Sequence, residues 1–231
     1  MCFEEIACPS CASRHVVKNG TTPNRKQKYL CRRCRRQFIR DYRYQGCRSE
    51  VRRLIVPMTL NGSGIRDIGR VLSVSINTVL KVIRAAAANT PEPYPPPRLA
   101  DVEVDEMWSF VEKKSNQSWL WYAFSPKLKQ VVGYVRGRRT DESCIRLLAK
   151  LARCQVTRFY TDWWESYQKL IPEHRHWAGK QGTQRIERNN LTIRTRLKRW
   201  HRRTICFSKS DEMDDAVIKL FFHHQNLNHK I

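Results

Sequence analysis

The sequence predicts an α/β protein in which a mixed α/β domain is preceded by two smaller modules. Cysteines and arginines punctuate the start of the chain, and apolar residues then recur at helical spacing. After the proline-rich stretch NTPEPYPPPR, which favours an extended segment, come three strand-like runs, a helix, a strand and a mainly helical end. We therefore expect a four-cysteine module at residues 1–46, a helix-turn-helix at 47–88, a linker at 89–99 and the α/β domain at 100–231.

The composition indicates a polyanionic partner. Lys and Arg number 44 against 21 Asp and Glu, which gives a formal net charge of +23 over 231 residues. A membrane surface fits less well, because the sequence has no run of about 18 apolar residues and no basic helix with an apolar face. The N-terminus has no secretion-signal pattern. We therefore expect a cytoplasmic protein that binds double-stranded DNA and no membrane.

The first module contains two Cys-x2-Cys pairs, Cys8 with Cys11 and Cys31 with Cys34. The 19 residues between the pairs match the spacing of four-thiolate zinc sites. Four protein ligands leave no open position, so one zinc ion would have a structural role in a small zinc ribbon or knuckle. The alternative is four unligated thiols in a reducing cytosol.

Basic residues surround the second cysteine pair, where acids are almost absent. They are suited to pair with DNA phosphates, although a solvated basic face is the alternative. The candidates are Arg32, Arg33, Arg35 and Arg36.

The second module shows three short helical patterns. The first begins near Glu50 and contains Pro57, which should kink or end it. A short second helix follows, and Ser75 then provides an N-cap for a third. In a helix-turn-helix the third helix enters the major groove, whereas a three-helix bundle without DNA is the alternative. The candidate base readers are Asn77, Thr78 and Lys81, with Arg84 closer to the DNA backbone.

Three acidic residues in the α/β domain form a candidate metal site. Alternation places Asp105 and Glu103 on one face of the first strand. Asp162 follows the strand VTRFY, and Glu187 lies on a predicted helix that starts near residue 183. Carboxylates suit Mg²⁺ or Mn²⁺, and two such ions can activate an attacking oxygen and stabilise a leaving one. A salt-bridge role is the alternative for any one of them, and Glu103 and Glu106 are rival ligands.

The helix that carries Glu187 continues into a strongly basic run. On a helix, Glu187 shares a flank with Arg194 and Lys198. We expect these two basic residues to hold phosphate, and the other basic side chains of the run to follow the DNA backbone. The predicted backbone contacts are Arg196, Arg199, Arg202 and Arg203, in addition to the phosphate contact of Lys198.

Several segments together resemble transposases of the insertion sequence one family: CPSC with CRRC, NGxGxRxIxRxLxVxxNTV, DEMW, TDWW, TQRIERNNL and FSKS. The resemblance covers nearly the whole chain. It implies an RNase H-like catalytic domain, a mixed sheet flanked by helices, whose Asp-Asp-Glu triad falls on Asp105, Asp162 and Glu187. It also implies a basic residue seven positions after the glutamate, Arg194. Trp163 departs from the pattern, because glycine is expected after the second aspartate.

The favoured function is therefore a DNA transposase that binds the terminal inverted repeats of an insertion sequence. Water activated by the divalent ions would hydrolyse a phosphodiester at each end, and the freed 3′-hydroxyl would attack target DNA. The alternatives are a structure-selective nuclease without strand transfer and a non-catalytic DNA-binding regulator, for which an intact triad is unnecessary. Because two ends are joined, we expect a homodimer or larger assembly that acts on the prokaryotic nucleoid.

Overall fold

The computed structural model describes residues 5–201 and 206–228. The chain forms two compact units, residues 1–49 and 50–231. The smaller unit corresponds to the predicted four-cysteine module. The helix-turn-helix falls in the larger unit together with the α/β domain, and the predicted boundaries of these two modules stay a prediction. Packing of its helices against that domain, described below, accounts for this grouping.

The smaller unit is a three-stranded antiparallel sheet with the order β1-β2-β3. Its core is small: Cys8, Cys31 and Phe38 are buried, and the Tyr29 ring stacks on Phe38 with centroids 5.7 Å apart. So little apolar burial does not stabilise a domain of this size without a further link such as a metal. The elements are β1 (Val16–Thr21), β2 (Gln27–Cys31), β3 (Gln37–Ile39) and a 3-10 turn, η1 (Gln45–Cys47).

Three helices follow, α1 (Ser49–Leu60), α2 (Ile65–Val71) and α3 (Ile76–Ala88), as the sequence predicts. Ser75 caps α3, because its hydroxyl accepts a hydrogen bond from the Thr78 amide at 3.2 Å. Of the two outcomes expected at Pro57, a kink or an end, the end is wrong, because α1 continues past it to Leu60. A proline removes the hydrogen bond to the carbonyl four residues earlier and crowds that carbonyl. That residue, Arg53, is exposed, so water can replace the missing donor.

Among the residues that the structure describes, no single helix is long and apolar enough to cross a membrane. The bent pair α2 and α3 passes the same length and composition test together, with an angle of 115° between the helices. These are the two helices of the helix-turn-helix, and the Ile68, Val79 and Ile83 side chains are fully buried in the core of the larger unit.

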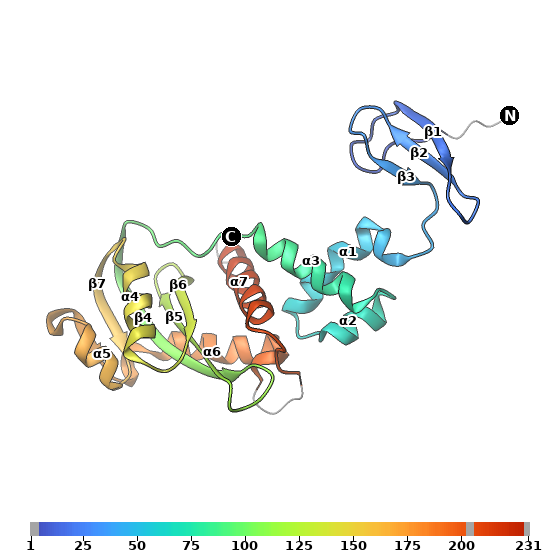
Figure 1. Ribbon diagram of the computed structural model, residues 1–231. Helices are drawn as coiled ribbons and strands as arrows, with labels where there is room; N and C mark the ends of the chain where they lie inside the picture. The colour runs from blue at the N-terminus through green and yellow to red at the C-terminus, as the bar shows by residue number, and fades with distance from the viewer. Residues whose placement is uncertain (1–4, 202–205, 229–231) are drawn as a thin grey trace. The chain divides into compact units, whose positions relative to one another are not determined.

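The remainder of the larger unit is built around a five-stranded mixed sheet with the order β6-β5-β4-β7-β8 (Figure 1). Strands β4, β5 and β6 are antiparallel neighbours, whereas β7 runs parallel to β4 and to β8. The predicted order of three strands, helix, strand and helix is confirmed. The strands are β4 (Arg98–Phe110), β5 (Gln117–Ser125), β6 (Gln130–Gly137), β7 (Gln155–Thr161) and β8 (His176–Ala178). The helices are α4 (Asp141–Leu151), α5 (Glu165–Leu170), α6 (Gln184–Arg196) and α7 (Asp211–Asn228).

Some boundaries differ from the expectation. Strand β4 begins at Arg98, so extended pairing starts inside the predicted linker. The backbone carbonyl of Pro97 accepts a hydrogen bond from the Gln155 amide at 2.8 Å, which ties the end of the linker to β7. Helix α6 ends at Arg196, and the basic run continues as a 3-10 turn, η4 (Lys198–Trp200). Lys198 therefore lies beyond the helical flank that the sequence assigned to it.

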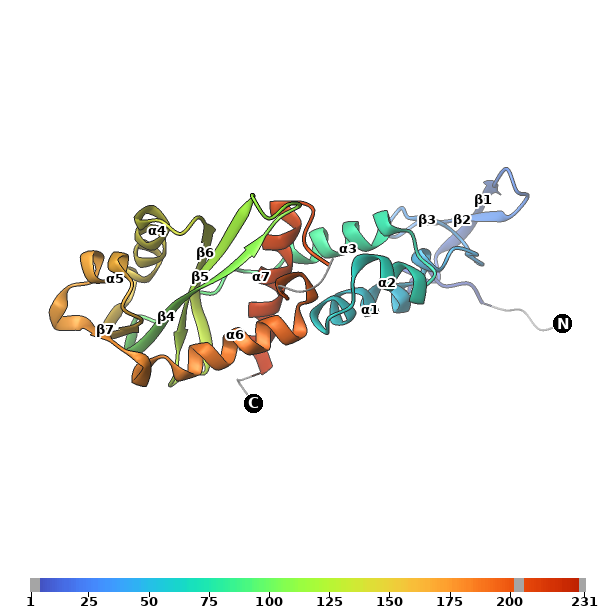
Figure 2. The same cartoon turned by 90° about the horizontal axis from the view of Figure 1, so that it is seen from below.

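Helices cover both faces of the sheet. Alternate residues such as Val102, Val104 and Trp121 pack with α4 and α5 on one face. Met107 and Tyr122 pack on the other face with α6 and α7, and Figure 2 shows α6 lying along the sheet. The face under α6 also carries Asp105, because residues 105 and 107 of a strand point the same way. This arrangement places Asp105 between the sheet and α6.

The helix-turn-helix shares its core with α6 and α7. Arg84 of α3 forms an ion pair with Glu212 of α7 at 3.0 Å. At the turn after α1, Asn61 accepts a hydrogen bond from Arg196 at 3.1 Å. Gly62 has φ of +84° there, and a Cβ on it would lie 3.5 Å from the Arg196 carbonyl. The end of α6 is thus packed directly against the turn between α1 and α2.

Candidate active site and metal centres

Asp105, in the interior of β4, and Asp162, just past the end of the parallel neighbour β7, lie side by side. The register of β4 and β7 pairs Glu103 with Tyr160, and each aspartate is two residues further along its strand. Asp162 directly follows the last residue of β7. The carboxyl ends of parallel strands are where sites gather in α/β sheets. The sequence places Asp105 within a strand and Asp162 at the end of another, and the structure has both in those positions.

The Asp105 carboxylate is half-buried and held by two hydrogen bonds. Its Oδ1 accepts from the Glu106 amide at 2.8 Å, and its Oδ2 accepts from Asn190 Nδ2 of α6 at 2.5 Å. Tyr122 donates its hydroxyl proton to Asn190 Oδ1 at 2.7 Å, which orients the amide. Burial raises the pKa of Asp105 to about 7; the Glu106 charge adds to the rise, and the Asn190 hydrogen bond opposes it. Burial therefore disfavours the charged form of this carboxyl, and a nearby cation would stabilise that form.

Asp162 is exposed at the start of a short loop. Its Oδ1 accepts a hydrogen bond from the Trp164 amide at 3.0 Å, a local turn that leads into α5. Trp163, which stands where the family pattern has glycine, is not among the described residues with positive φ. A glycine's conformational freedom is therefore not needed at this position, and the loop accommodates tryptophan without backbone strain.

A third carboxylate, that of Glu106, meets these two. Ligand oxygens of Asp105, Glu106 and Asp162 all lie within 4.8 Å of one another. Glu106 points to the face covered by α4 and α5, where its Oε2 accepts from the Tyr167 hydroxyl at 2.7 Å. Its Oε1 accepts two hydrogen bonds from Arg139, at 2.9 Å and 2.6 Å. Only 2% of the Glu106 side chain is exposed, and burial raises its pKa while these donors oppose the rise.

Arg139 is itself held by aromatic rings. Its guanidinium lies 5.1 Å from the Trp119 ring centroid and 4.9 Å from that of Trp164. Trp164 in turn packs on Trp121 with ring centroids 4.9 Å apart. The geometry fits a positioning role for Arg139, which neutralises the Glu106 charge beside the two aspartates.

Glu187 lies on α6, as the sequence predicts, and its carboxylate accepts a hydrogen bond from the Thr183 hydroxyl at 3.1 Å. Asn190, which contacts Asp105, is three residues further along and so shares its helix face. Within the described ranges, the acidic group that could hold a metal consists of Asp105, Glu106 and Asp162, and does not include Glu187. Glu187 is exposed, and its carboxylate is hydrogen-bonded to the residue that precedes its own helix.

Glu103, the other rival ligand, has a different place. It is buried, and its Oε2 accepts a hydrogen bond from the Ile186 amide in the first turn of α6 at 2.6 Å. A carboxylate is favourable at this end of a helix, because the free amides and the helix dipole attract negative charge. Glu103 thus anchors the helix that carries Glu187 and Asn190, which fits a structural role.

The three-carboxylate cluster fits a divalent cation of the magnesium type. Mg²⁺ and Mn²⁺ prefer oxygen ligands and are held by one or two carboxylates plus water and substrate oxygens. Asp162 is exposed, so an ion at this position is accessible to a substrate. Histidine and cysteine, which a zinc or copper site would use, are not part of the group that the described chain presents here.

The four cysteines of the smaller unit converge as predicted. The Cys8 and Cys34 sulfurs are 3.5 Å apart, and those of Cys11 and Cys31 are 3.6 Å apart. Zinc–sulfur bonds of about 2.3 Å in a tetrahedron place sulfurs about 3.8 Å apart. The cluster therefore fits one zinc ion with small adjustments.

The two cysteine pairs form equivalent knuckles. In each, the first cysteine's amide donates to the carbonyl five residues on, and its carbonyl accepts from the amide four residues on, all at 2.9 Å. Ala12 and Arg35, which follow the pairs, both have positive φ, of 54° and 62°. Amides of Cys34 and Arg33 donate to the Cys31 sulfur and lower its pKa to about 6. These donors favour the thiolate form that binds metal.

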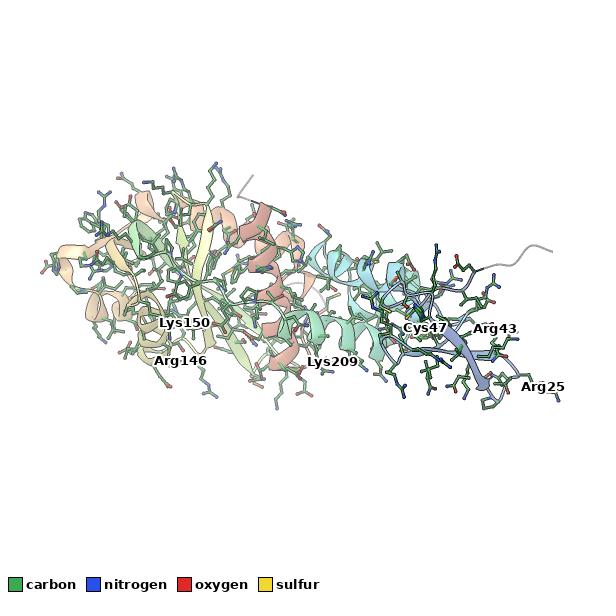
Figure 3. The ribbon with its side chains drawn as sticks, turned by 90° about the horizontal axis from the view of Figure 1, so that it is seen from above. Arg25, Arg43, Cys47, Arg146, Lys150 and Lys209 are labelled. Carbon is green, nitrogen blue, oxygen red and sulfur yellow. The ribbon has the colours of Figure 1, made fainter. Side chains whose placement is uncertain are left out.

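The predicted phosphate contacts of the smaller unit lie at its surface. All four arginines around the second knuckle are exposed. Arg36 contacts the Ser10 hydroxyl, which links the two knuckles. Arg25, at the turn between β1 and β2, projects away from the sheet in Figure 3. This surface remains a proposed DNA contact.

In α3, Asn77 and Lys81 are exposed and Thr78 is half-buried. Thr78 serves the Ser75 cap, since their hydroxyls lie 3.0 Å apart. Arg84 is exposed but engaged with Glu212. Asn77 and Lys81 are therefore the best placed of the predicted base readers.

The basic run after Glu187 divides into different roles. Arg194 is half-buried and Lys198 is exposed. Arg199 does not fit the predicted phosphate contact, because its guanidinium turns inward and donates to Ser208 Oγ at 2.9 Å. Burial lowers the pKa of Arg199, while the nearby Asp214 charge raises it. Two further predicted contacts, Arg202 and Arg203, lie outside the described residues.

The sequence reasoning missed the supporting residues of the site. Asn190 lies one helical turn after Glu187, so a helical wheel could have indicated it. Arg139 and Tyr167 come from segments 33 and 61 residues from Glu106, and no local pattern links them to it. Glu106 was considered a rival ligand, but its two donors depend on tertiary structure.

Comparisons with known proteins agree with this geometry. A family model described as IS1 transposase matches residues 99–228, and models described as the InsA N-terminal and C-terminal domains match residues 1–35 and 42–86. With the strand order, these matches support an RNase H-like α/β domain preceded by a zinc ribbon and a helix-turn-helix.

Relatives with high sequence identity match about half of the chain. An insertion element iso-IS1n protein InsB from Shigella dysenteriae is 51% identical over 119 residues, which are 52% of this chain and 91% of that protein. An insertion element IS1 protein InsB from Shigella sonnei is 41% identical over 127 residues, 55% of this chain and 95% of that protein. A chain in a cryo-EM structure of a simian T-cell lymphotropic virus intasome has a TM-score of 0.38 and 14% identity, covering 72% of this chain and 66% of that chain.

Proposed function

The chain belongs to the IS1 transposase family and binds DNA as an insertion-sequence transposase, and we propose that Asp105, Asp162 and Glu187 hold the divalent ions that cut and join its DNA. The observation that carries the proposal is the convergence of the Asp105 carboxylate, on β4, with the Asp162 carboxylate, at the end of the parallel strand β7, on the face that α6 with Glu187 covers. Cleavage at the terminal inverted repeats and strand transfer into target DNA are the reactions proposed.

When bound, the divalent ions would activate the attacking oxygen and stabilise the leaving one. The chain's own groups prepare the site for them. Asn190 and the Glu106 amide fix the Asp105 carboxylate, and the Trp164 amide fixes that of Asp162. In the first step water displaces the 3′-oxygen of the element end from phosphorus, and in the second that 3′-hydroxyl displaces an oxygen of a target phosphodiester. Each step breaks one P–O bond and forms another.

Basic residues beside the site are suited to hold the phosphates during these steps. Arg194 lies on α6 seven residues after Glu187, two helical turns along the same face. Lys198 is exposed in the turn that follows α6. We propose that both pair with phosphate oxygens, whereas Arg199 supports the fold.

The third metal ligand is tested by comparing two amide variants. Glu187→Gln is expected to reduce cleavage of terminal DNA by orders of magnitude, because it removes a charge that would bind metal. Glu106→Gln should cost about tenfold or less, because Tyr167 and Arg139 still hold the side chain in place. Cleavage of labelled terminal DNA with Mg²⁺ or Mn²⁺ measures both. The reverse ranking would assign the third ligand to Glu106, and Glu103→Gln, which keeps the acceptor for Ile186, is the control.

A strand-transfer assay distinguishes the transposase from a nuclease of the same fold. Pre-cut terminal DNA with a free 3′-hydroxyl and a supercoiled plasmid should give joined products with the wild-type chain. Cleavage without joined products would favour the structure-selective nuclease. Neither cleavage nor joining, with end binding retained, would favour the non-catalytic regulator.

Sequence-specific binding is expected to depend on α3. Lys81→Ala or Asn77→Ala should each weaken binding to the element end by about 1–3 kcal/mol, because each side chain is exposed on the helix expected in the major groove. Binding to random DNA should fall much less. Electrophoretic shifts of both DNAs with the full chain measure this, and Lys127→Ala, an exposed lysine in the β5–β6 turn, is the charge-matched control. Equal losses on both DNAs would show that α3 does not read bases.

The assembly and the cofactor content follow from the same proposal. We propose one structural zinc ion in the smaller unit and two divalent ions, Mg²⁺ or Mn²⁺, at the carboxylates. Two element ends must be held together for joining, so a homodimer or larger assembly should form on DNA. The relatives of this chain come from bacterial insertion elements, so we expect the protein to act on the nucleoid in the cytoplasm.

A further inference from the structure

An exposed tryptophan directly follows the second aspartate of the site. Trp163 is 70% exposed. Across the described residues, the aromatic and cation–π contacts do not include its ring. Its neighbour Trp164, by contrast, packs on Trp121 and Tyr167 with ring centroids 4.9 Å and 5.7 Å apart. One indole of the pair thus builds the core and the other is presented to solvent beside Asp162.

The loop that presents Trp163 is held on both sides. The Asp162 carboxylate accepts from the Trp164 amide, and the Trp163 carbonyl accepts from Gln168 Nε2 at 2.9 Å. Thr161 before it bonds His176 Nε2 of β8 at 2.7 Å. A ring on such a loop loses little conformational freedom when a ligand packs on it, which favours binding.

A further pair of aromatic side chains lies on the neighbouring strands β7 and β8. Tyr160 of β7 pairs in register with Trp177 of β8, and their ring centroids are 6.2 Å apart. Trp177 is 44% exposed. The turn η3 (Lys180–Gly182) follows, where a side chain at Gly182 would collide with the Tyr160 ring and where Lys180 is exposed. Trp177 is thus in register with the residue two positions before Asp162, and the exposed Lys180 lies three residues after Trp177.

We propose that Trp163 and Trp177 form a base-stacking subsite for unpaired nucleotides of the element end next to the bond that is cut. The inference rests on the proposed function, since it takes the DNA at Asp162 as given. Aromatic rings interleaved with basic residues bind single strands by stacking bases and pairing phosphates, with little sequence preference. The net charge of +23 favours a polyanion over an apolar protein partner at this surface. Lys180 supplies the phosphate contact.

Binding to paired and unpaired ends tests the subsite without relying on cleavage. The full chain is titrated, in Ca²⁺ in place of Mg²⁺, with a fully duplex element end and with one that carries three mismatched base pairs at the cut. The wild-type chain should bind the mismatched end more tightly by about 5- to 150-fold, because a stacked base contributes that much and mismatched bases need not be unpaired first.

Trp163→Ala should abolish this preference, so that both ends bind with about equal affinity, while duplex binding stays unchanged. Trp163→Phe should keep most of the preference. Tyr94→Ala is the matched control, because Tyr94 is 73% exposed but lies in the linker. Trp177→Ala should lower the preference in part. An unchanged preference in Trp163→Ala, or a changed assembly size in place of a changed preference, would overturn the subsite. Failure of the carboxylate variants to affect cleavage would overturn the proposed function and leave the binding result intact.

Discussion

Asp105→Asn and Asp162→Asn are each expected to reduce DNA cleavage and strand transfer by on the order of 10³-fold or more. Each substitution preserves the side-chain shape but removes a negative charge from the carboxylate cluster. Metal ions at such sites contribute several kcal/mol of transition-state stabilisation, and about 1.4 kcal/mol corresponds to a factor of ten in rate. Gel assays of cleavage and joining on labelled terminal DNA measure the loss.

The fold of the Asp105→Asn variant should be intact. Because burial raises the pKa of Asp105 to about 7, the folded chain holds more protons at this carboxyl than the unfolded chain between about pH 4 and pH 7. The free energy of unfolding therefore falls as pH rises through that window. An amide carries no charge, so Asp105→Asn should melt at the same or a higher temperature at pH 7.5 without divalent ions.

Divalent ions give the complementary measurement. Millimolar Mg²⁺ or Mn²⁺ should raise the melting temperature of the wild-type chain and have little effect on Asp105→Asn, because a ligand stabilises only the state that binds it. Asp101→Asn is the control: Asp101 lies on the same face of β4 but is paired with Arg158 at 2.6 Å. Full cleavage by both Asp105→Asn and Asp162→Asn would show that these carboxylates do not hold the catalytic metal.

The positions of the two aspartates follow from the sequence because they depend on local patterns. Alternation places Glu103 and Asp105 on one face of β4, and the end of an apolar strand places Asp162 at the sheet edge. The cysteine pairs are equally local, since each knuckle is built from consecutive residues. Where chemistry depends on residues a few positions apart, periodicity and spacing were sufficient.

The supporting contacts depend on distant segments and could not be predicted. Strand β8, with three residues, and α5, with six, are too short for a periodic signal. The inward turn of Arg199 depends on Asp214, which lies on a different helix. The proline-rich linker marks the helix-turn-helix as a module of its own in the sequence, whereas the core that α3 shares with α7 is visible only in the structure.

Loss of the structural metal should unfold the smaller unit and leave the larger one folded. Cys31→Ser removes a ligand whose pKa is already lowered toward the thiolate form. Structural zinc contributes an apparent binding free energy of about 10–16 kcal/mol in small zinc modules, more than the few buried residues of this unit supply. Metal analysis of the wild-type chain should find one zinc per chain, and Cys31→Ser should contain none.

Hydrogen exchange separates this outcome from general unfolding. In Cys31→Ser, amides of β1, β2 and β3 should exchange rapidly, whereas those of β4 and β5 should stay protected, because the two units are separately compact. Binding to the element end should weaken, since the arginines around Cys34 lose their fixed positions. Cys47→Ser is the matched control: Cys47 is exposed and is not part of the four-sulfur cluster. A Cys31→Ser chain that kept its zinc, or that lost zinc and still protected β1, β2 and β3, would contradict the structural role of the metal.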